Sequence, residues 1–411
     1  MSLHLEDEQV KLARRILAAG PICDECLGRP FAKVGRGLAN AERGRAAREL
    51  AGEAGKAGTC WVCGGLFLQA EAWAERAARR VEGIEFETFL FGVRPSARLA
   101  RTTAVFEERF PSEEGESLNH AFNRVVGKAF EARLDRTATV RFTAPDVSFV
   151  IDLGSDAIDL EVASLYVYGR YRKLIRGIPQ TRWPCRRCRG RGCTTCGFVG
   201  KQYAESVEEW IAAPLLEAAE GEDAHLHGAG REDIDARMLG DGRPFVLEIV
   251  APRRRGLDLG ALRDQVNGHA TGKVEVSALS PSNRAAVALL KELRATKRYR
   301  ARVAFGEAVS PEKLREAIAA LCGEIEQRTP HRVAHRRADR MRSRRLIFAS
   351  GRQESPLEAV IEFETDGGLY VKELVSGDRG RTNPNLSDLV GARAAVIELD
   401  VLEVRSDAFP D

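Results

Sequence analysis

Residues 227–250 read HGAGREDIDARMLGDGRPFVLEIV, a glycine-rich loop that leads into an apolar run. The run PFVLEIV has the length and composition of a β-strand. Between the first glycine and this strand lie three acids, Glu232, Asp233 and Asp235, and three arginines, Arg231, Arg237 and Arg243. Such clustering of opposite charges between glycines indicates a loop that holds a carboxylate in place.

Strand and helix patterns alternate on both sides of this stretch. The patterns predict strands at 224–228, 244–250, 272–279, 298–305, 357–365, 368–376 and 394–404. Helical periodicity predicts helices at 206–220, 259–268, 282–293 and 312–322, the first of them kinked or divided by Pro214. Strands joined both by hairpins and by helices are typical of a mixed, mostly antiparallel sheet with helices packed on it, so we expect an α+β fold.

The 411 residues are enough for two or three domains. We expect a helical region with the first cysteines at 1–82, a small α+β module with a second cysteine cluster at 83–204, and the sheet domain at 205–411. Within the module, Gly154-Ser155-Asp156 predicts a hairpin turn. No apolar run of about 18 residues is present, and the first residues carry acids where a signal peptide has basic ones. We therefore expect a cytoplasmic protein with no membrane partner.

Eight of the nine cysteines form four Cys-x-x-Cys pairs. Two such pairs can hold one tetrahedral ion, and a reducing cytosol disfavours disulfides, which are the alternative. The first cluster, predicted to bind structural zinc, is Cys23, Cys26, Cys60 and Cys63. The second, predicted to bind zinc or else an iron–sulfur cluster, is Cys185, Cys188, Cys193 and Cys196. Four sulfurs leave no open position for water, so neither site is expected to be catalytic. Cys322 lies in a helical pattern and is expected to be a buried core residue.

Positive charge is concentrated in two segments, although the whole chain carries only +3. Residues 162–204 contain ten Lys or Arg and no acid, and residues 328–345 contain eight Arg and one acid, Asp339. A charge run is often only a solvated face. The first segment also carries aromatic residues of the kind that stack on unpaired bases: Tyr166, Tyr168, Tyr171, Trp183, Phe198 and Tyr203. We therefore expect an RNA partner. The chain has no Walker-type loop and no G-x-G-x-x-G opening a helix, which argues against a nucleotide cofactor.

Several segments occur together in a recognisable order. The knuckles CDEC and CWVC precede PDVSFVIDL and LEVASLYVYGRYRKLIRGIPQTRW; then come GREDIDARMLGDGRPFVLE, KRYRARV, QRTPHRVAHRRAD, YVKELVSGDRGRTNPN and IELDV. In this order they resemble the tRNA pseudouridine synthases of the tenth family, archaeal enzymes that make pseudouridine 54 and 55 in the T-arm. The resemblance implies a THUMP-type RNA-binding region in the middle of the chain and a pseudouridine synthase fold after it. It further implies an isomerase that acts on tRNA and needs no catalytic cofactor.

The resemblance also assigns residues to the reaction. It places the catalytic carboxylate in the GRED box, which implies Asp233, and it makes Lys372 the basic partner that keeps Asp233 ionised. A carboxylate near the anomeric carbon can act as nucleophile, or can accept the proton whose loss produces a glycal-type intermediate. Asp235 is the competitor for this role, and we assign it instead to a structural pair with Arg237 or Arg243. The glycines of the loop are expected to let an RNA backbone and a flipped base approach.

Four further residues are implied in substrate binding. Tyr299 would stack on the extruded uracil, Val371 and Leu399 would form apolar walls, and Arg231 would meet phosphate or a carboxylate. From the sequence alone, Tyr299 is a strand-face aromatic and the two apolar residues are ordinary strand-core positions. The alternative function is a non-catalytic tRNA-binding protein with zinc and THUMP-type modules. We expect a monomer in either case.

Overall fold

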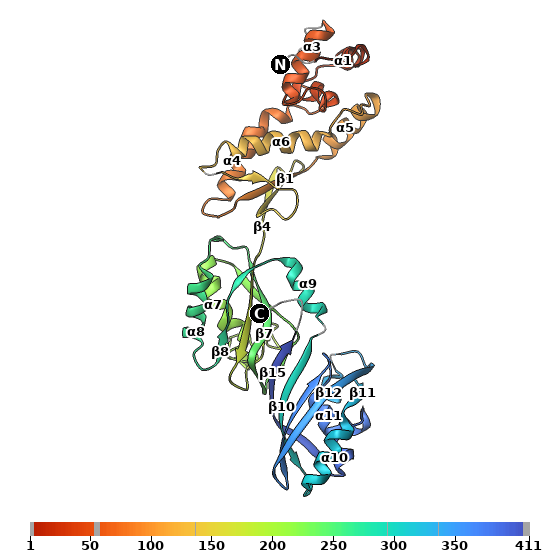
Figure 1. Cartoon of the computed structure of the whole chain (residues 1–411). Helices are drawn as coiled ribbons and strands as arrows, with labels where there is room; N and C mark the ends of the chain where they lie inside the picture. Colours follow the sequence, from red (N-terminus) through yellow and green to blue (C-terminus); the bar gives the residue numbers. More distant parts are fainter. Residues whose placement is uncertain (1–3, 53–57, 136, 294, 336, 406–411) are drawn as a thin grey trace. The chain divides into compact units, whose positions relative to one another are not determined.

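The computed structural model describes residues 4–52, 58–135, 137–293, 295–335 and 337–405. The chain forms two compact units (Figure 1). Unit 1 comprises residues 1–164 and 251–255, and unit 2 comprises residues 165–250 and 256–411. The regions expected from the sequence ended at residues 82 and 204. The structure divides the chain elsewhere, because strand β5 (Leu165–Lys173) is hydrogen-bonded into the sheet of unit 2.

Unit 1 combines a helical N-terminal part with a four-stranded sheet. Its helices are α1 (Asp7–Ala19), α2 (Asp24–Gly28), α3 (Asn40–Ala51), α4 (Ala70–Arg80), α5 (Ala97–Arg109) and α6 (Leu118–Glu131), with the 3-10 turns η1 (Arg29–Phe31) and η2 (Leu66–Gln69). The strands β1 (Thr88–Arg94), β2 (Thr139–Val140), β3 (Val147–Asp152) and β4 (Ala157–Val162) lie in the order β2-β1-β3-β4. The predicted hairpin turn is confirmed between β3 and β4, where the Asp152 carboxylate accepts the N–H groups of Gly154 and Ser155 at 2.8 and 3.1 Å.

The core of this sheet is aromatic. Phe89 and Phe91 are two residues apart in β1, so both side chains lie on the same face of the strand and are buried there. They meet Phe149 of β3 and Phe130 of α6, and all four rings are buried with centroid separations between 4.6 and 5.9 Å. Burial of these rings fixes α6 against the sheet.

Unit 2 is built on a long sheet with the order β14-β11-β12-β13-β10-β15-β7-β5-β8, to which β6 and β9 add at β7 and β5. After β5, its strands are β6 (Asp223–Gly228), β7 (Ala236–Val250), β8 (Val274–Val276), β9 (Ser280–Ser282), β10 (Thr296–Phe305), β11 (Gly323–Arg328), β12 (Met341–Ser355), β13 (Glu358–Thr365), β14 (Thr382–Asn383) and β15 (Ala394–Arg405). β7 and β15 run parallel, and the other strand pairs described for this sheet are antiparallel. The expected α+β class, with a mixed and mostly antiparallel sheet, is confirmed.

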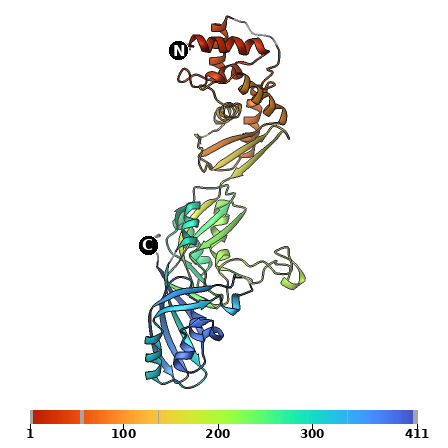
Figure 2. The same ribbon diagram turned by 90° about the vertical axis from the view of Figure 1, so that its right-hand side faces the viewer.

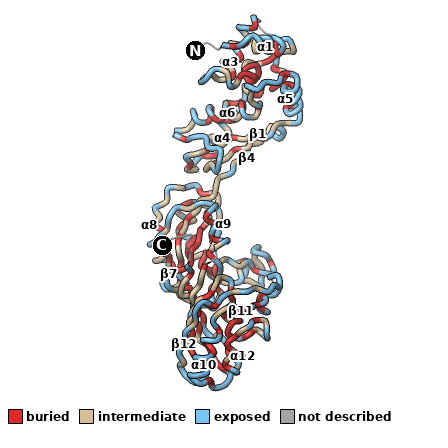
Figure 3. Tube along the Cα trace, turned by 45° about the vertical axis from the view of Figure 1, so that its right-hand side comes forward, coloured by how far each residue is buried: buried red, intermediate tan, exposed pale blue. Residues whose placement is uncertain are grey.

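Helices pack on both halves of this sheet. They are α7 (Val207–Ala219), α8 (Leu259–His269), α9 (Arg284–Glu292), α10 (Pro311–Leu321), α11 (Val371–Ser376) and α12 (Leu386–Val390), with the 3-10 turns η3 (Thr194–Cys196), η4 (His331–Val333) and η5 (Gly377–Gly380). One apolar core lies between β5–β8 and α7 and α8, and a second lies between β10–β13 and α10–α12. Figure 3 shows buried residues following the strands of the sheet, with exposed residues on the connections.

Several expectations were wrong in detail. Residues 371–376 of the expected strand 368–376 form α11, which packs against β15. Helix α7 continues from Val207 to Ala219 with Pro214 inside it, so of the two expected effects of the proline, division of the helix is excluded. Cys322 is exposed, because α10 ends one residue before it. Strand β12 was missed because its many arginines and polar residues hide the apolar alternation of a strand.

Candidate active site

The catalytic loop, residues 229–235, connects β6 to β7 and places Asp233 between two cations. The Asp233 carboxylate lies 3.1 Å from the Arg332 guanidinium through Oδ1 and 3.3 Å from Lys372 Nζ through Oδ2. Its side chain is 32% exposed, so the carboxylate can still be reached from solvent. The expected neighbour Lys372 is therefore present, and a second cation accompanies it.

Asp235 does not have the partners that the sequence suggested. Lys372 Nζ lies 2.8 and 2.7 Å from the two Asp235 oxygens, closer than it lies to Asp233. Arg237 instead forms a bidentate pair with Asp400, at 2.9 and 2.7 Å, and Arg243 pairs elsewhere. Although burial alone would raise the pKa of Asp235, the hydrogen bond and charge of Lys372 hold it below its ordinary value. Lys372 thus bridges the two aspartates of the loop.

Arg332 is the residue near Asp233 that sequence reasoning missed. It lies in η4, within the arginine-rich segment 328–345. Its Nε donates to Glu373 Oε1 at 2.7 Å while its Nη1 donates to Asp233. Burial would lower the pKa of the Arg332 guanidinium, but Glu373 and Asp233 hold it above its ordinary value. Residues 332 and 233 are 99 positions apart, so only the fold reveals the pair.

A buried ionic pair lies beneath the loop. Glu232 and Arg243 have side chains that are 0% and 1% exposed, and the carboxylate accepts from Arg243 Nε at 2.8 Å. The Tyr171 hydroxyl lies 2.9 Å from both Glu232 oxygens, and Gln180 donates to that hydroxyl at 2.7 Å and to the Gly230 carbonyl at 3.0 Å. Burial would lower the pKa of Arg243, but the Glu232 carboxylate keeps it above its ordinary value. Tyr171, expected to stack on RNA, is buried and therefore belongs to this network.

A buried lysine fixes the backbone of the catalytic loop. Lys173 is fully buried, and its Nζ donates to the carbonyls of Ile178, Asp233 and Ile234 at 3.0, 3.1 and 3.2 Å. Burial lowers the pKa of this ammonium group to about 8. Lys173 therefore ties the backbone at Asp233 to strand β5.

Two glycines, Gly230 in the catalytic loop and Gly240 in β7, occupy positions that a larger residue would not fit. Gly230 has a φ of +78°, and a Cβ atom there would lie 2.9 Å from Lys297 Nζ. A Cβ atom at Gly240 would lie 1.9 Å from the Leu402 carbonyl oxygen, where β7 and β15 approach each other. The positive φ at Gly230 and the Leu402 carbonyl at Gly240 account for glycine at these two positions, and the expected approach of an RNA backbone stays a prediction.

The remaining implied residues lie in the same unit. Tyr299 is half-buried in β10 between Phe363 of β13 and Val401 of β15. Burial raises the pKa of its phenol to about 12, and the Asp233 charge acts in the same direction. Val371 and Leu399 are buried in the apolar cluster against which Tyr299 packs.

Arg231 was expected to meet phosphate or a carboxylate. Its guanidinium lies over the ring of Trp183, with 4.8 Å to the ring centroid, and the expected contact stays a prediction. The Trp183 ring in turn meets Tyr203 edge-on at 5.6 Å. The contact links the GRED box to the segment that carries the second cysteine cluster.

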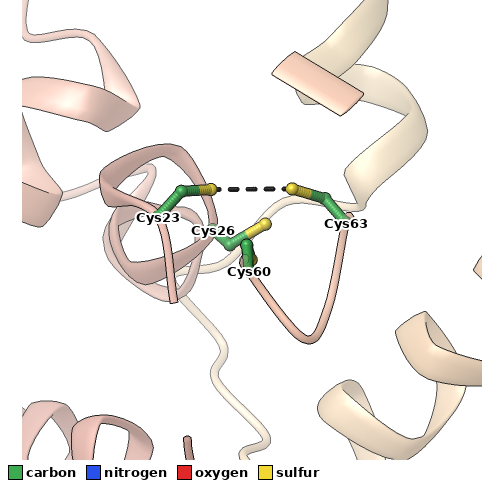
Figure 4. A group of neighbouring side chains, drawn as sticks. All are labelled: Cys23, Cys26, Cys60 and Cys63. Atoms are coloured by element: carbon green, nitrogen blue, oxygen red, sulfur yellow. Dashed lines mark hydrogen bonds between the residues drawn. The ribbon is translucent and has the colours of Figure 1, made fainter. Parts of the chain in front are cut away.

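The two cysteine clusters each bring four sulfurs together, as the spacing predicted. Within each set the Sγ atoms lie within 4.8 Å of one another. In the first set, Cys23 and Cys26 approach from α2 and Cys60 and Cys63 from a turn (Figure 4). The Cys23 and Cys63 sulfurs are 3.6 Å apart, near the separation of about 3.8 Å expected for two thiolates on a tetrahedral zinc with Zn–S bonds of about 2.3 Å. The donor set fits a metal ion.

The second cluster has the same character. The distance between Cys193 Sγ and Cys196 Sγ is 3.8 Å, and that between Cys188 Sγ and Cys196 Sγ is 3.9 Å. The backbone N–H groups of Cys193 and Gly200 point at the Cys196 sulfur from 3.3 and 3.2 Å, a geometry that favours a thiolate.

Comparison with known proteins matches both units. The family model for the C-terminal region of Pus10 matches residues 166–405, and the model for the archaeal Pus10 THUMP domain matches residues 73–152. A protein of Halorubrum lacusprofundi named tRNA pseudouridine synthase Pus10 is 45% identical over 98% of this chain and 97% of its own length. A protein of the same name from Methanothrix thermoacetophila is 43% identical over 97% of this chain and 95% of its own length.

Proposed function

Because this chain belongs to the Pus10 family of tRNA pseudouridine synthases, we propose that it isomerises uridine at positions 54 and 55 of the tRNA T-arm with Asp233 as the catalytic residue. The observation that supports this assignment most directly is the setting of Asp233. It is the one acid of the GRED box that is both accessible and held by two cations, Arg332 and Lys372.

The chemistry requires three changes at one nucleotide. The bond between uracil N1 and ribose C1′ breaks, the freed base rotates, and a bond forms between C5 and C1′, after which C5 loses a proton and N1 gains one. An ionised carboxylate can attack C1′, or can accept the ribose C2′ proton whose loss produces a glycal intermediate. Asp233 serves in either course, and Arg332 and Lys372 orient it.

The uracil would lie against Tyr299, with Val371 and Leu399 as apolar walls. Val371 and Leu399 belong to one apolar cluster and Tyr299 packs against it, which supports this placement. A base removed from its stack regains contact by stacking on an aromatic ring. Asp235, paired with Lys372, would set the position of that lysine.

We propose that both cysteine clusters bind structural zinc. Zinc supplies a tetrahedral crosslink between four thiolates and takes no part in the reaction. Reduced thiol clusters and a tRNA substrate are consistent with a cytoplasmic enzyme. We further expect it to act as a monomer.

The test is to incubate the purified protein with an unmodified tRNA transcript and map pseudouridine. The proposal predicts pseudouridine at positions 54 and 55, and its absence from a transcript with cytidine at both positions. The non-catalytic alternative predicts tRNA binding without product. Product at other positions only would refute the T-arm assignment.

A further inference from the structure

The second cysteine cluster is part of an arm that leaves the sheet of unit 2. We call residues 184–201 the cysteine arm; an antiparallel bridge between Pro184 and Lys201 closes its base. Figure 2 shows this segment, in yellow-green, projecting from the sheet. It contributes no strand to the sheet of unit 2. The arm is thus not needed to complete the sheet.

The arm presents an aromatic ring to solvent. Phe198 is 73% exposed and Val199 is 63% exposed. Phe198 has a φ of +64°, in the left-handed region that bulky residues rarely adopt. Its N–H donates to the Cys193 carbonyl at 2.9 Å, so the cysteine turn holds this conformation. A strained backbone that displays an exposed aromatic ring indicates a binding role rather than a packing role.

The charge of the arm favours a polyanion. Arg186, Arg187, Arg189 and Arg191 are all exposed, and the arm contains no acidic residue. Two of these arginines are held by the arm itself, because Arg187 donates to Thr195 Oγ1 at 2.9 Å and Arg191 donates to the Cys188 carbonyl at 3.3 Å. An arm that carries both exposed arginines and an exposed aromatic ring matches a nucleotide, with its phosphate and its base.

The base of the arm lies against the catalytic loop. Trp183 immediately precedes the arm, and its carbonyl accepts the N–H of Gln202 just after the arm at 2.9 Å. The same Trp183 ring carries the Arg231 guanidinium, and Arg231 is two residues from Asp233. The base of the arm therefore lies next to the loop that carries Asp233.

We propose that the cysteine arm is a second tRNA contact, in which Phe198 stacks on an unpaired base of the substrate while the arm's arginines meet the adjacent phosphates. This inference rests on the proposed function, because it takes tRNA as the substrate. It also singles out one of the aromatic residues in the segment 162–204 as the one that can stack on a base. Of the segment's six aromatic residues, Tyr171 is buried, Tyr166, Tyr168, Trp183 and Tyr203 are half-buried, and Phe198 is exposed.

The test measures affinity for an unmodified tRNA transcript by filter binding, in an Asp233→Asn background so that no product accumulates. Stacking of one base on an aromatic side chain corresponds to roughly a 5- to 150-fold change in affinity. We expect Phe198→Ala and Phe198→Leu to weaken binding within that range, and Phe198→Tyr to bind like its parent. Leu357→Ala, at a site 49% exposed in the turn between β12 and β13, is the control and should bind normally.

Two outcomes would overturn the inference. Normal binding by Phe198→Ala would show that the ring does not touch tRNA. If Phe198→Leu binds tRNA normally while Phe198→Ala binds it weakly, the side chain makes an apolar contact and does not stack on a base. The zinc content of each variant shows whether its arm is intact. If Phe198→Ala loses zinc, the affinities of Phe198→Tyr and Phe198→Leu are used to test the inference. Because affinity is measured without turnover, failure of the arm and failure of the proposed reaction give different results.

Discussion

Replacing Glu232 by Gln removes the carboxylate that neutralises Arg243 in the interior of unit 2. The two side chains are 0% and 1% exposed, and the Arg243 guanidinium would keep its charge with no ionised partner at 2.8 Å. Breaking a buried pair in this way costs about 3–5 kcal/mol. Lys297 would lose a nearby negative charge as well, because Glu232 raises the pKa of Lys297, which burial has lowered to about 8. We therefore expect Glu232→Gln to lower the free energy of unfolding of unit 2 by about 3–5 kcal/mol.

Urea unfolding at constant pH, followed by tryptophan fluorescence, measures this change. Unit 1 contains Trp61 and Trp73, and unit 2 contains Trp183 and Trp210. Replacing the first two by Phe in both proteins makes the fluorescence report unit 2 alone. The comparison is then between two chains that differ only at Glu232.

The control is Glu358→Gln, the same chemical change in an exposed pair of the same unit. Glu358 pairs with Arg302 at 2.7 Å, with side chains 33% and 42% exposed, and its loss should cost less than about 1 kcal/mol. Adding Arg243→Met to Glu232→Gln should recover part of the loss, because no unpaired charge then remains buried. If Glu232→Gln costs no more than the control, the buried pair does not support the catalytic loop and the reasoning is refuted.

Three further predictions concern the lysine below the loop, the metal clusters and the basic segment. The pKa of Lys173 lies near 8 in the folded protein and near 10.5 in the unfolded chain, so the unfolded chain binds more protons between these values. The free energy of unfolding of wild type, measured relative to that of Lys173→Met by urea unfolding, should therefore rise by up to about 3 kcal/mol between pH 8 and 10.5. A fall of this difference over the same range would contradict the lowered pKa of Lys173. Cys26→Ser and Cys196→Ser should each remove about one zinc per chain in elemental analysis, and undiminished zinc in either variant would exclude that cluster as its site. Arg337→Ala should lower the slope of log affinity for tRNA against log salt by about 1, and an unchanged slope would mean that Arg337 makes no phosphate contact.

The sequence was sufficient for the features that depend on local spacing. Paired cysteines predicted both four-sulfur clusters, and alternating apolar residues predicted most of the sheet. The GRED box pointed to the loop in which Asp233 lies beside Lys372. In each case the residues that matter are close in sequence or belong to a pattern repeated along the chain.

Contacts between distant segments could not be predicted in the same way. The pairing of Arg332 with Asp233 depends on where η4 lies relative to the β6–β7 connection. The partners of Asp235 and Arg237 were misassigned because neighbours in sequence were preferred over Lys372 and Asp400, which come from α11 and β15. Helix α11 was taken for a strand because its short apolar run fits either structure.

The central claim is that Asp233, and not Asp235, is the catalytic carboxylate, and single-turnover pseudouridine formation with enzyme in excess tests it most directly. Asp233→Asn keeps the shape of the side chain and should form no product, while tRNA affinity stays close to that of wild type because phosphate contacts dominate binding. Asp235→Asn should retain reduced activity, since it removes an exposed pair and leaves Lys372 beside Asp233. Product at a near-normal rate from Asp233→Asn, with none from Asp235→Asn, would contradict the assignment.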